Sequence, residues 1–472
     1  MSEHVENPLP VVVIGAGPVG LAAAAHLLEQ GLEPLVLEAG DQAGAAVRAW
    51  GHVRLFSPWE YDVDDAAVRL LQPTGWTSPE PDQLPTGAEL VERYLAPLAA
   101  TPALSARIRT GTRVVAVSRA GVDKTRTVGR EGRPYLVRTV VDGRVHDLTA
   151  RAVIDASGTW GQANPLGASG LPAVGEEQAA DWLVGPLPDV LGRDRARFAG
   201  RHTLVVGMGH SAANTLLALV ELQRDEPGTE ITWAIRGRSP ARLYGGGDSD
   251  GLPARGLLGS TLRSAVRSGA VRLLREVTIT GLTTPADGAA LLHVTGSGRA
   301  GVAVDLYVNA LAAATGFRPD LDMLREVRLS LDPGVEAPAR LAPLIDPNVH
   351  SCGTVPPHGH RDLEHPDEGF YLVGMKSYGR APTFLLATGY EQVRSIAAAL
   401  AGDTAAADSV QLHLPSTGVC STDLGAREDA ETSTVGFATG SEHGWSAEEP
   451  EAASCCGSAP QPVTIGAPAS SC

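Results

Sequence analysis

The chain has 472 residues, of which 43% are hydrophobic and 19% charged, so it is long enough for two globular domains with further segments. Its formal net charge of −16 repels nucleic-acid phosphates and anionic membrane surfaces, which argues against both as partners. The acidic N-terminus lacks a signal-peptide pattern, and no apolar run approaches the roughly 18 residues of a membrane span. We therefore expect a cytoplasmic protein.

The first predicted unit is a strand, a helix and a second strand, at residues 11–14, about 18–30 and 34–38. Its turn has the spacing G-x-G-x-x-G, formed by Gly15, Gly17 and Gly20. Glycines there allow a tight turn, close approach of a pyrophosphate and close packing of helix on strand. Pro18 begins the helix, whose N-terminus attracts phosphate, and Glu38 is placed to accept hydrogen bonds from both ribose hydroxyls of an adenosine. The unit predicts a dinucleotide site.

The same pattern returns at Thr203, with strands at residues 203–206 and 231–236 around a helix that ends near residue 223. The turn and helix start contain Gly207, Gly209, His210, Ser211 and, at the third glycine position, Ala212. His210 is placed to contact a pyrophosphate or to face solvent. Instead of a carboxylate, Arg236 and Arg238 follow the second strand, which favours a 2′-phosphate and hence NADPH. The alternative is that both arginines are ordinary surface charges.

The two units, with the second inserted into the first, resemble the two-dinucleotide-binding-domain flavoproteins over about residues 10–402. Three further segments carry the resemblance: VIDASGTW with Gly158, ALAAATGFRPD, and GFYLVGMKSYGRAPTFLLATGYEQ with Gly374 and Thr383. The resemblance implies an α/β fold of two Rossmann-like three-layer domains, with Gly374 beside the ribityl chain of FAD and Thr383 near the start of a flavin-facing helix. Its domains are FAD-binding (8–165 and 309–402), NADPH-binding (166–308) and a disordered acidic tail (403–472).

The cysteines distinguish branches of this group. They are Cys352, Cys420, Cys455, Cys456 and Cys472, without a Cys-x-x-Cys or Cys-x4-Cys pair. Thioredoxin reductases and lipoamide dehydrogenases relay electrons through such a pair, so electrons are expected to pass to oxygen here. RFAGRHTLVVGMGHSA resembles flavin-containing monooxygenases, although their F-x-G-x-x-x-H motif is absent. VRLFSPWEYDVD and MKSYGRAPTFLLATGYEQVRSIA more nearly resemble the flavin-dependent monooxygenases of bacterial arsenic-resistance operons, which implies a small-molecule substrate and a link to arsenic detoxification.

The candidate catalytic residues are Lys376, Arg54 and Trp59, with Arg48 and Ser57 also expected near the flavin. The family often has Gly-Asp after the last strand, whereas this chain has Gly374-Met375-Lys376. Lys376 draws notice because the sequence has only one other lysine, Lys124. Alternatively, Trp59 is an ordinary core residue, and Arg48 and Arg54 are surface charges with no role at the flavin.

In the tail, Cys455 and Cys456 are adjacent, and paired thiolates suit soft ions such as trivalent arsenic or mercury. The alternative is that they are incidental residues of a disordered tail. Three functions therefore stay open: an NADPH-dependent flavin monooxygenase, a flavin-dependent NADPH reductase or metal-ion reductase, and a soft-ion binding or sensing protein.

Overall fold

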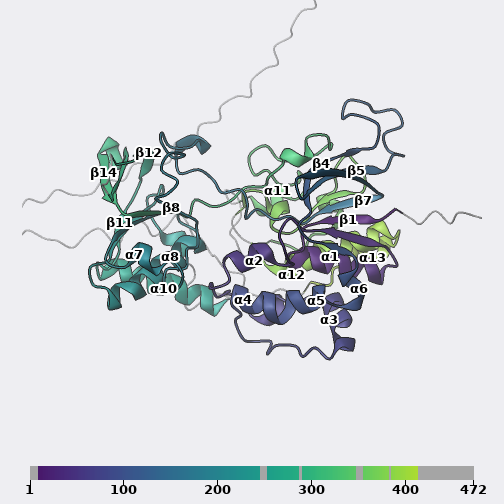
Figure 1. Cartoon of the computed structure of the whole chain (residues 1–472), viewed down its shortest axis with the longest axis horizontal. Helices are drawn as coiled ribbons and strands as arrows, with labels where there is room; N and C mark the ends of the chain where they lie inside the picture. Colours follow the sequence, from purple (N-terminus) through teal and green to yellow (C-terminus); the bar gives the residue numbers. More distant parts are fainter. Residues whose placement is uncertain (1–8, 245–251, 286–289, 347–354, 382–383, 413–472) are drawn as a thin grey trace, which may run out of the picture. The chain divides into compact units, whose positions relative to one another are not determined.

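The computed structural model describes residues 9–244, 252–285, 290–346, 355–381 and 384–412 (Figure 1). These residues contain two parallel five-stranded sheets and two antiparallel three-stranded sheets. Each parallel sheet packs against helices on one face and against an antiparallel sheet on the other. The expected fold class, two Rossmann-like three-layer domains, is confirmed.

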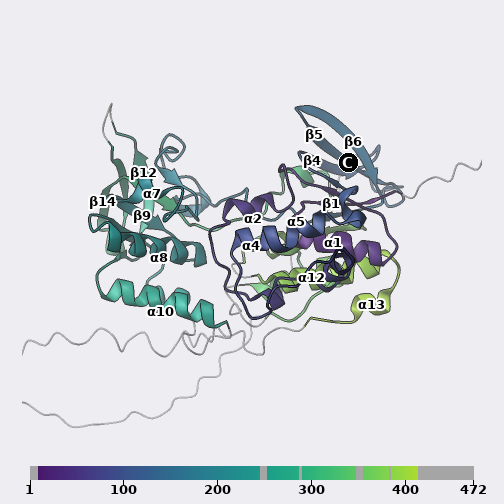
Figure 2. The same cartoon turned by 60° about the horizontal axis from the view of Figure 1, so that its bottom comes forward.

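The first parallel sheet is built around β1 (Val11–Ile14), which is apolar on both faces as a central parallel strand must be. Val11 and Val13 pack towards α1 (Pro18–Glu29) and α12 (Leu386–Leu400), which lie side by side (Figures 1 and 2). The strand order is β16-β7-β1-β2-β3, with bounds Phe370–Leu372, Ala152–Asp155, Val11–Ile14, Pro34–Leu37 and Ile108–Arg109.

The opposite face of this sheet is covered by a meander of three antiparallel strands. Val12 and Ile14 of β1 share a buried cluster with Val117 and Val137 from the meander. Period-two alternation along each strand therefore divides the side chains between two layers. The strands are β4 (Arg113–Arg119), β5 (Tyr135–Val141) and β6 (Arg144–Ala150).

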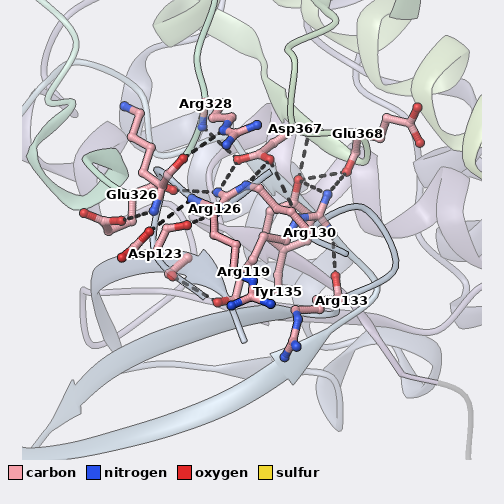
Figure 3. Close-up of polar contacts among 12 residues, drawn as sticks. Arg119, Asp123, Arg126, Arg130, Arg133, Tyr135, Glu326, Arg328, Asp367 and Glu368 are labelled. Atoms are coloured by element: carbon pink, nitrogen blue, oxygen red, sulfur yellow. Dashed lines mark hydrogen bonds and ion pairs between the residues drawn. The ribbon is translucent and has the colours of Figure 1, made fainter. Parts of the chain in front are cut away.

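A buried ion-pair network holds the β4–β5 connection to distant parts of the chain (Figure 3). Arg130 donates two hydrogen bonds of 2.7 Å to the carboxylate of Asp367, and the main-chain N–H of Arg328 donates a third at 2.8 Å. Burial alone would raise the pKa of Asp367, but the hydrogen bonds from Arg130 and Arg328, together with the charges of Arg130 and Arg119, lower it below its usual value. Arg119 donates to the main-chain oxygen of Glu368, so the meander is fixed beside the start of β16.

The second parallel sheet repeats this construction. Helices α8 (His210–Asp225) and α10 (Pro253–Arg267) pack against each other, and α8 buries an apolar stripe at helical spacing. On the other face lie β12 (Thr278–Thr283), β13 (Leu292–Ser297) and β14 (Ala303–Val308). The strand order is β11-β10-β9-β15-β8, with bounds Arg272–Leu274, Glu230–Ala234, His202–Val206, Ala310–Ala313 and Leu183–Val184.

Strand β15 corrects one expected boundary. The sequence places residues 309–402 in the FAD-binding domain, yet Ala310 pairs with Thr203 and Ala313 with Val206 in the second sheet. The first three residues of β15 are fully buried, because small apolar side chains fit a central strand packed on both faces. The return to the first domain therefore follows Ala313.

The chain passes between the two domains along two adjacent antiparallel segments. Ala163 and Phe317 form a β-bridge, the N–H of Asn164 donates to Gly316 at 2.9 Å, and the N–H of Arg318 donates to Gln162 at 3.0 Å. The second domain is thus an insertion in the first, as expected.

The remaining α-helices are short: α2 (Ala45–Ala49), α3 (Asp65–Leu71), α4 (Gly87–Leu90), α5 (Ala96–Ala99), α6 (Pro102–Ser105), α7 (Arg195–Phe198), α9 (Ala241–Tyr244), α11 (Ala342–Ile345) and α13 (Thr404–Asp408). None of the described helices combines the length and apolar character needed to cross a membrane.

Helix α13 corrects the expected start of the tail at residue 403. Asp403 caps it by accepting from the N–H of Ala406 at 2.9 Å, and Ser395 of α12 donates to the carbonyl of Ala407 at 2.7 Å. Five residues are too few to show helical periodicity in the sequence. The tail from residue 413 onward lies outside the described residues.

Candidate nucleotide-binding sites

The first glycine turn follows β1, and sterics explain two of its glycines. Gly15 has φ of +98°, and a β-carbon on it would lie 2.9 Å from the carbonyl oxygen of Ala156. A β-carbon on Gly20 would lie 2.0 Å from the carbonyl oxygen of Gly15, so helix and turn pack too closely for any side chain. At Gly17 a β-carbon would meet nothing within 4 Å.

Gly17 and Gly158 form an open cradle. Gly17 precedes Pro18 as the N-cap of α1, so the positive end of the helix dipole lies at this turn. Gly158, just beyond β7, has φ of +69° and also open space at its β-carbon position. Within the described part of the chain, the N–H groups of Gly17 and Gly158 have no acceptor. Space and unpaired donors together fit a pyrophosphate.

Glu38 lies just beyond β2, as expected, and has a role that the sequence did not predict. Its Oε2 accepts from the N–H of Ala16 at 2.7 Å, and its Oε1 accepts from the N–H of Gly40 at 2.7 Å. The carboxylate therefore braces the glycine turn. Each oxygen keeps lone-pair capacity for a ribose hydroxyl, so bracing and ribose binding are compatible.

The turn after β16 differs from the expected strand-to-helix link. Gly374–Tyr378 forms a 3-10 turn, and α12 begins only at Leu386. Gly374 has φ of +64°, and its N–H donates to Gln392 of α12 at 2.7 Å. The expected contribution of Thr383 to a helix N-terminus lies outside the described residues.

Lys376 does not present its ammonium to an open site, contrary to the expectation of a catalytic residue. The side chain is fully buried, and Nζ lies 2.6 Å from Oδ2 of Asp155 and 3.0 Å from Oγ of Ser157. Successive side chains of a 3-10 turn point about 120° apart, and the neighbouring Met375 is partly exposed while Lys376 is buried. The structure makes Lys376 half of a buried ion pair.

Arg54 and Trp59 also occupy structural positions. Trp59 is 2% exposed and belongs to the core around α1, which is the ordinary-core interpretation. Arg54 is 59% exposed on its side chain, donates to the carbonyl of Leu84, and lies 3.8 Å from Glu89. The contacts of Arg54 and Trp59 do not activate either side chain as an acid, a base or a nucleophile. Arg48 is likewise exposed and lies 3.7 Å from Glu92 as its ion-pair partner.

Asp62 is a buried acid that sequence reasoning missed. Ser57 donates to its Oδ1 at 2.8 Å, while Oδ2 has no hydrogen-bond partner within the described residues. Burial raises the pKa of Asp62 to about 7 against the lowering effect of the Ser57 hydrogen bond. Asp62 lies within the VRLFSPWEYDVD segment, but neighbouring Glu60 and Asp64 give the sequence no means of telling which acid is buried.

The second glycine turn follows β9 and is also open. A β-carbon on Gly207 would lie 1.9 Å from the carbonyl oxygen of Ala314, whereas one on Gly209 would meet nothing within 4 Å. Ala212 is fully buried, which confirms that a methyl group fits where the third glycine would stand. His210 and Ser211 form the first turn of α8, at the positive end of a 16-residue helix.

The two arginines beyond β10 differ in their surroundings. Arg238 pairs with Glu276 at 3.3 Å and its side chain is 87% exposed. Arg236 is exposed and has neither an ion pair nor a hydrogen bond to another described residue. An unpaired guanidinium at the end of this strand is free to bind a 2′-phosphate.

The described residues contain no cluster of three or more His, Cys, Asp or Glu side chains that could hold a metal ion. The predicted soft-ion ligands, Cys455 and Cys456, lie outside those residues.

Two parallel sheets, each with an open glycine turn at a helix N-terminus, define a flavoprotein oxidoreductase with sites for FAD and NADPH. The chain belongs to the pyridine nucleotide-disulphide oxidoreductase family, whose model matches residues 12–348. A ferredoxin–NADP reductase from Ralstonia nicotianae is 31% identical over 215 residues, which are 46% of this chain and 48% of that protein. The chain thus spans about half the length of that curated relative.

Two solved structures share the fold over most of the chain. Bacillithiol disulfide reductase Bdr (YpdA) from Bacillus cereus has a TM-score of 0.58 at 20% identity, covering 84% of this chain and 99% of that one. Ornithine N-hydroxylase from Kutzneria sp. 744 has a TM-score of 0.56 at 16% identity, with the same coverage of 84% and 99%. At these identities the likeness concerns the fold, which serves both disulfide reduction and N-hydroxylation.

Proposed function

We propose that this chain is an NADPH-dependent FAD monooxygenase that passes electrons to molecular oxygen and oxygenates a small molecule. The observation that carries the proposal is the absence of cysteine before Cys352 in the sequence. A flavoprotein that reduces disulfides through its own chain needs at least one cysteine thiolate beside the flavin. Neither βαβ unit nor the segments around Gly158 contain one.

The residues of each turn have separate tasks in this proposal. The N–H groups of Gly17 and Gly158 bind the pyrophosphate of FAD, and Glu38 orients its adenosine ribose. Arg236 selects NADPH over NADH by pairing with the 2′-phosphate. FAD, when bound, supplies the redox chemistry, and the protein supplies binding and orientation.

Spectroscopy under controlled oxygen tests this function. The purified protein should lose its visible flavin absorbance with NADPH under anaerobic conditions and regain it in air. Oxygen-18 gas should label the product of a candidate substrate. No bleaching with NADPH or NADH would refute the two-nucleotide assignment, and bleaching without any labelled product would refute the monooxygenase.

A reductase is the second candidate, favoured by the 31% identity to a ferredoxin–NADP reductase. In that case reoxidation should depend on an added electron acceptor such as ferredoxin or a metal ion, with no oxygen-18 in any product. The same anaerobic sample distinguishes the two, because the acceptor can be added before air.

The link to arsenic rests on the sequence resemblance and on the adjacent Cys455 and Cys456. Trivalent arsenic should raise NADPH consumption in air if it is a substrate. If the chain instead binds or senses a soft ion, trivalent arsenic should bind without changing turnover, and Cys455→Ser with Cys456→Ser should abolish that binding.

A further inference from the structure

The Lys376–Asp155 ion pair continues through a hydroxyl to the surface of the FAD cradle. Both charged side chains are fully buried, and their charged atoms lie 2.6 Å apart. Ser157 donates from Oγ to Asp155 Oδ1 at 2.6 Å and accepts from Lys376 Nζ at 3.0 Å. Ser157 itself is exposed and directly precedes Gly158. The buried ion pair thus fixes the side chain of Ser157, which is next to the open glycine Gly158.

The pair joins two turns at the carboxyl edge of the first sheet. Asp155 ends β7, Lys376 follows β16, and these strands are parallel neighbours with Leu372 opposite Asp155. Each turn contains a glycine in the left-handed region, with φ of +69° at Gly158 and +64° at Gly374. Ligands of open parallel sheets bind at this edge.

Helix α12 fixes the second turn from its other side. Gln392 accepts from the N–H of Gly374 at 2.7 Å and donates to Ser377 Oγ at 2.9 Å. Gln392 also lies 2.9 Å from Nε2 of His358, whose Nδ1 faces the carbonyl of Pro356 at 3.1 Å. Burial lowers the pKa of His358, so its neutral ring can accept at Nε2. The Gly374 turn is therefore anchored at both ends.

A contribution to stability does not by itself explain the buried Lys376–Asp155 ion pair. Two buried charges lose most of their hydration, and well-packed apolar residues often replace such a pair without loss of stability. What apolar residues cannot reproduce is the directional bond from Lys376 to Ser157. The Lys376–Asp155 pair therefore fixes the position of the Ser157 hydroxyl, in addition to filling its own volume in the core.

We propose that Lys376 is a positioning residue that acts through Asp155 and Ser157 to set the spacing between the Gly158 turn and the Gly374 turn, and thereby the affinity and environment of bound FAD. This inference rests on the FAD site of the proposed function. It requires no chemistry from the Lys376 ammonium.

The test measures FAD binding to deflavinated protein, together with the visible spectrum of the bound flavin. Lys376→Met combined with Asp155→Asn removes both charges at similar volume and should keep the fold. We expect the FAD dissociation constant to rise about tenfold or more, with a changed flavin band shape. Ser157→Ala, at an exposed position, should show the same changes to a smaller degree without a shift in melting temperature.

Lys124→Met is the matched control, because Lys124 is exposed and its Nζ contacts only the carbonyl of Arg325 among described residues. It should leave FAD affinity and spectrum unchanged. Wild-type affinity and spectrum in Ser157→Ala and in the folded double variant would overturn the positioning role. If the double variant does not fold, Ser157→Ala decides alone. Failure of the wild-type chain to bind FAD would instead refute the proposed function.

Discussion

The hydroxyl of Tyr390 donates a 2.8 Å hydrogen bond to the main-chain carbonyl of Asp62, which ties α12 to the loop that precedes α3. The side chain of Asp62 is fully buried in this loop, with one carboxylate oxygen bonded to Ser57. The protein therefore buries an acid beside a helix of the FAD-binding domain without an opposing cation in direct contact among the described residues.

Asp62 should make the protein less stable as pH rises from about 4 to about 7. Its folded-state pKa of about 7 lies above the ordinary aspartate value of 3.8, so the folded state keeps a proton that the unfolded state has lost. The change in unfolding free energy should be at most about 4 kcal/mol, at about 1.4 kcal/mol per pKa unit. Denaturant unfolding at several pH values measures it.

Asp62→Asn should remove this part of the pH dependence, since Asn carries no proton to lose in this range. Asp147→Asn is the control, because Asp147 is a surface partner of Arg138. A wild-type pH profile in Asp62→Asn would show that the buried carboxyl is not the titrating group.

Gly17→Ala should weaken FAD binding without destabilising the fold, whereas Gly20→Ala should destabilise the fold itself. The added methyl on Gly20 would lie 2.0 Å from a main-chain oxygen, which should cost several kcal/mol of stability. The methyl on Gly17 meets no protein atom within 4 Å, so the melting temperature of the apoprotein should stay near that of the wild type. FAD affinity should still fall, because the methyl occupies the phosphate space. Equal loss of stability in both variants would contradict this division.

Arg236→Ala should raise KM for NADPH about tenfold or more and leave KM for NADH nearly unchanged. Arg238→Ala should have a weaker effect, because Glu276 already pairs with Arg238. Steady-state flavin reduction with both nucleotides measures the preference. An equal change for NADPH and NADH would mean that Arg236 does not recognise the 2′-phosphate.

Asp367→Ala should destabilise the protein by about 3–5 kcal/mol, because it leaves buried Arg130 without its anion. The exposed pair of Arg138 and Asp147 offers the comparison, and Asp147→Ala should cost about 1 kcal/mol or less. Thermal unfolding of the two variants under identical conditions gives the difference. Comparable losses would show that the network in Figure 3 contributes no more than a surface ion pair.

The sequence predicted the glycine turns because their glycines stand at a fixed spacing after an apolar strand, a pattern that is visible without knowledge of the distant main-chain atoms that Gly15 and Gly207 face. The direction of Lys376 was not predictable in this way. Its partner Asp155 lies 221 positions away, and a 3-10 turn gives no alternation from which to infer burial. Asp62 and α13 were missed for a related reason, since tertiary contacts stabilise them.

The adjacent crossings at Ala163 and Phe317 also have a consequence for changes to the inserted segment. Because the inserted segment leaves and re-enters the first domain at neighbouring points, its two ends can be joined across by a short linker. A deletion or replacement confined to this segment would therefore leave the rest of the FAD-binding domain continuous.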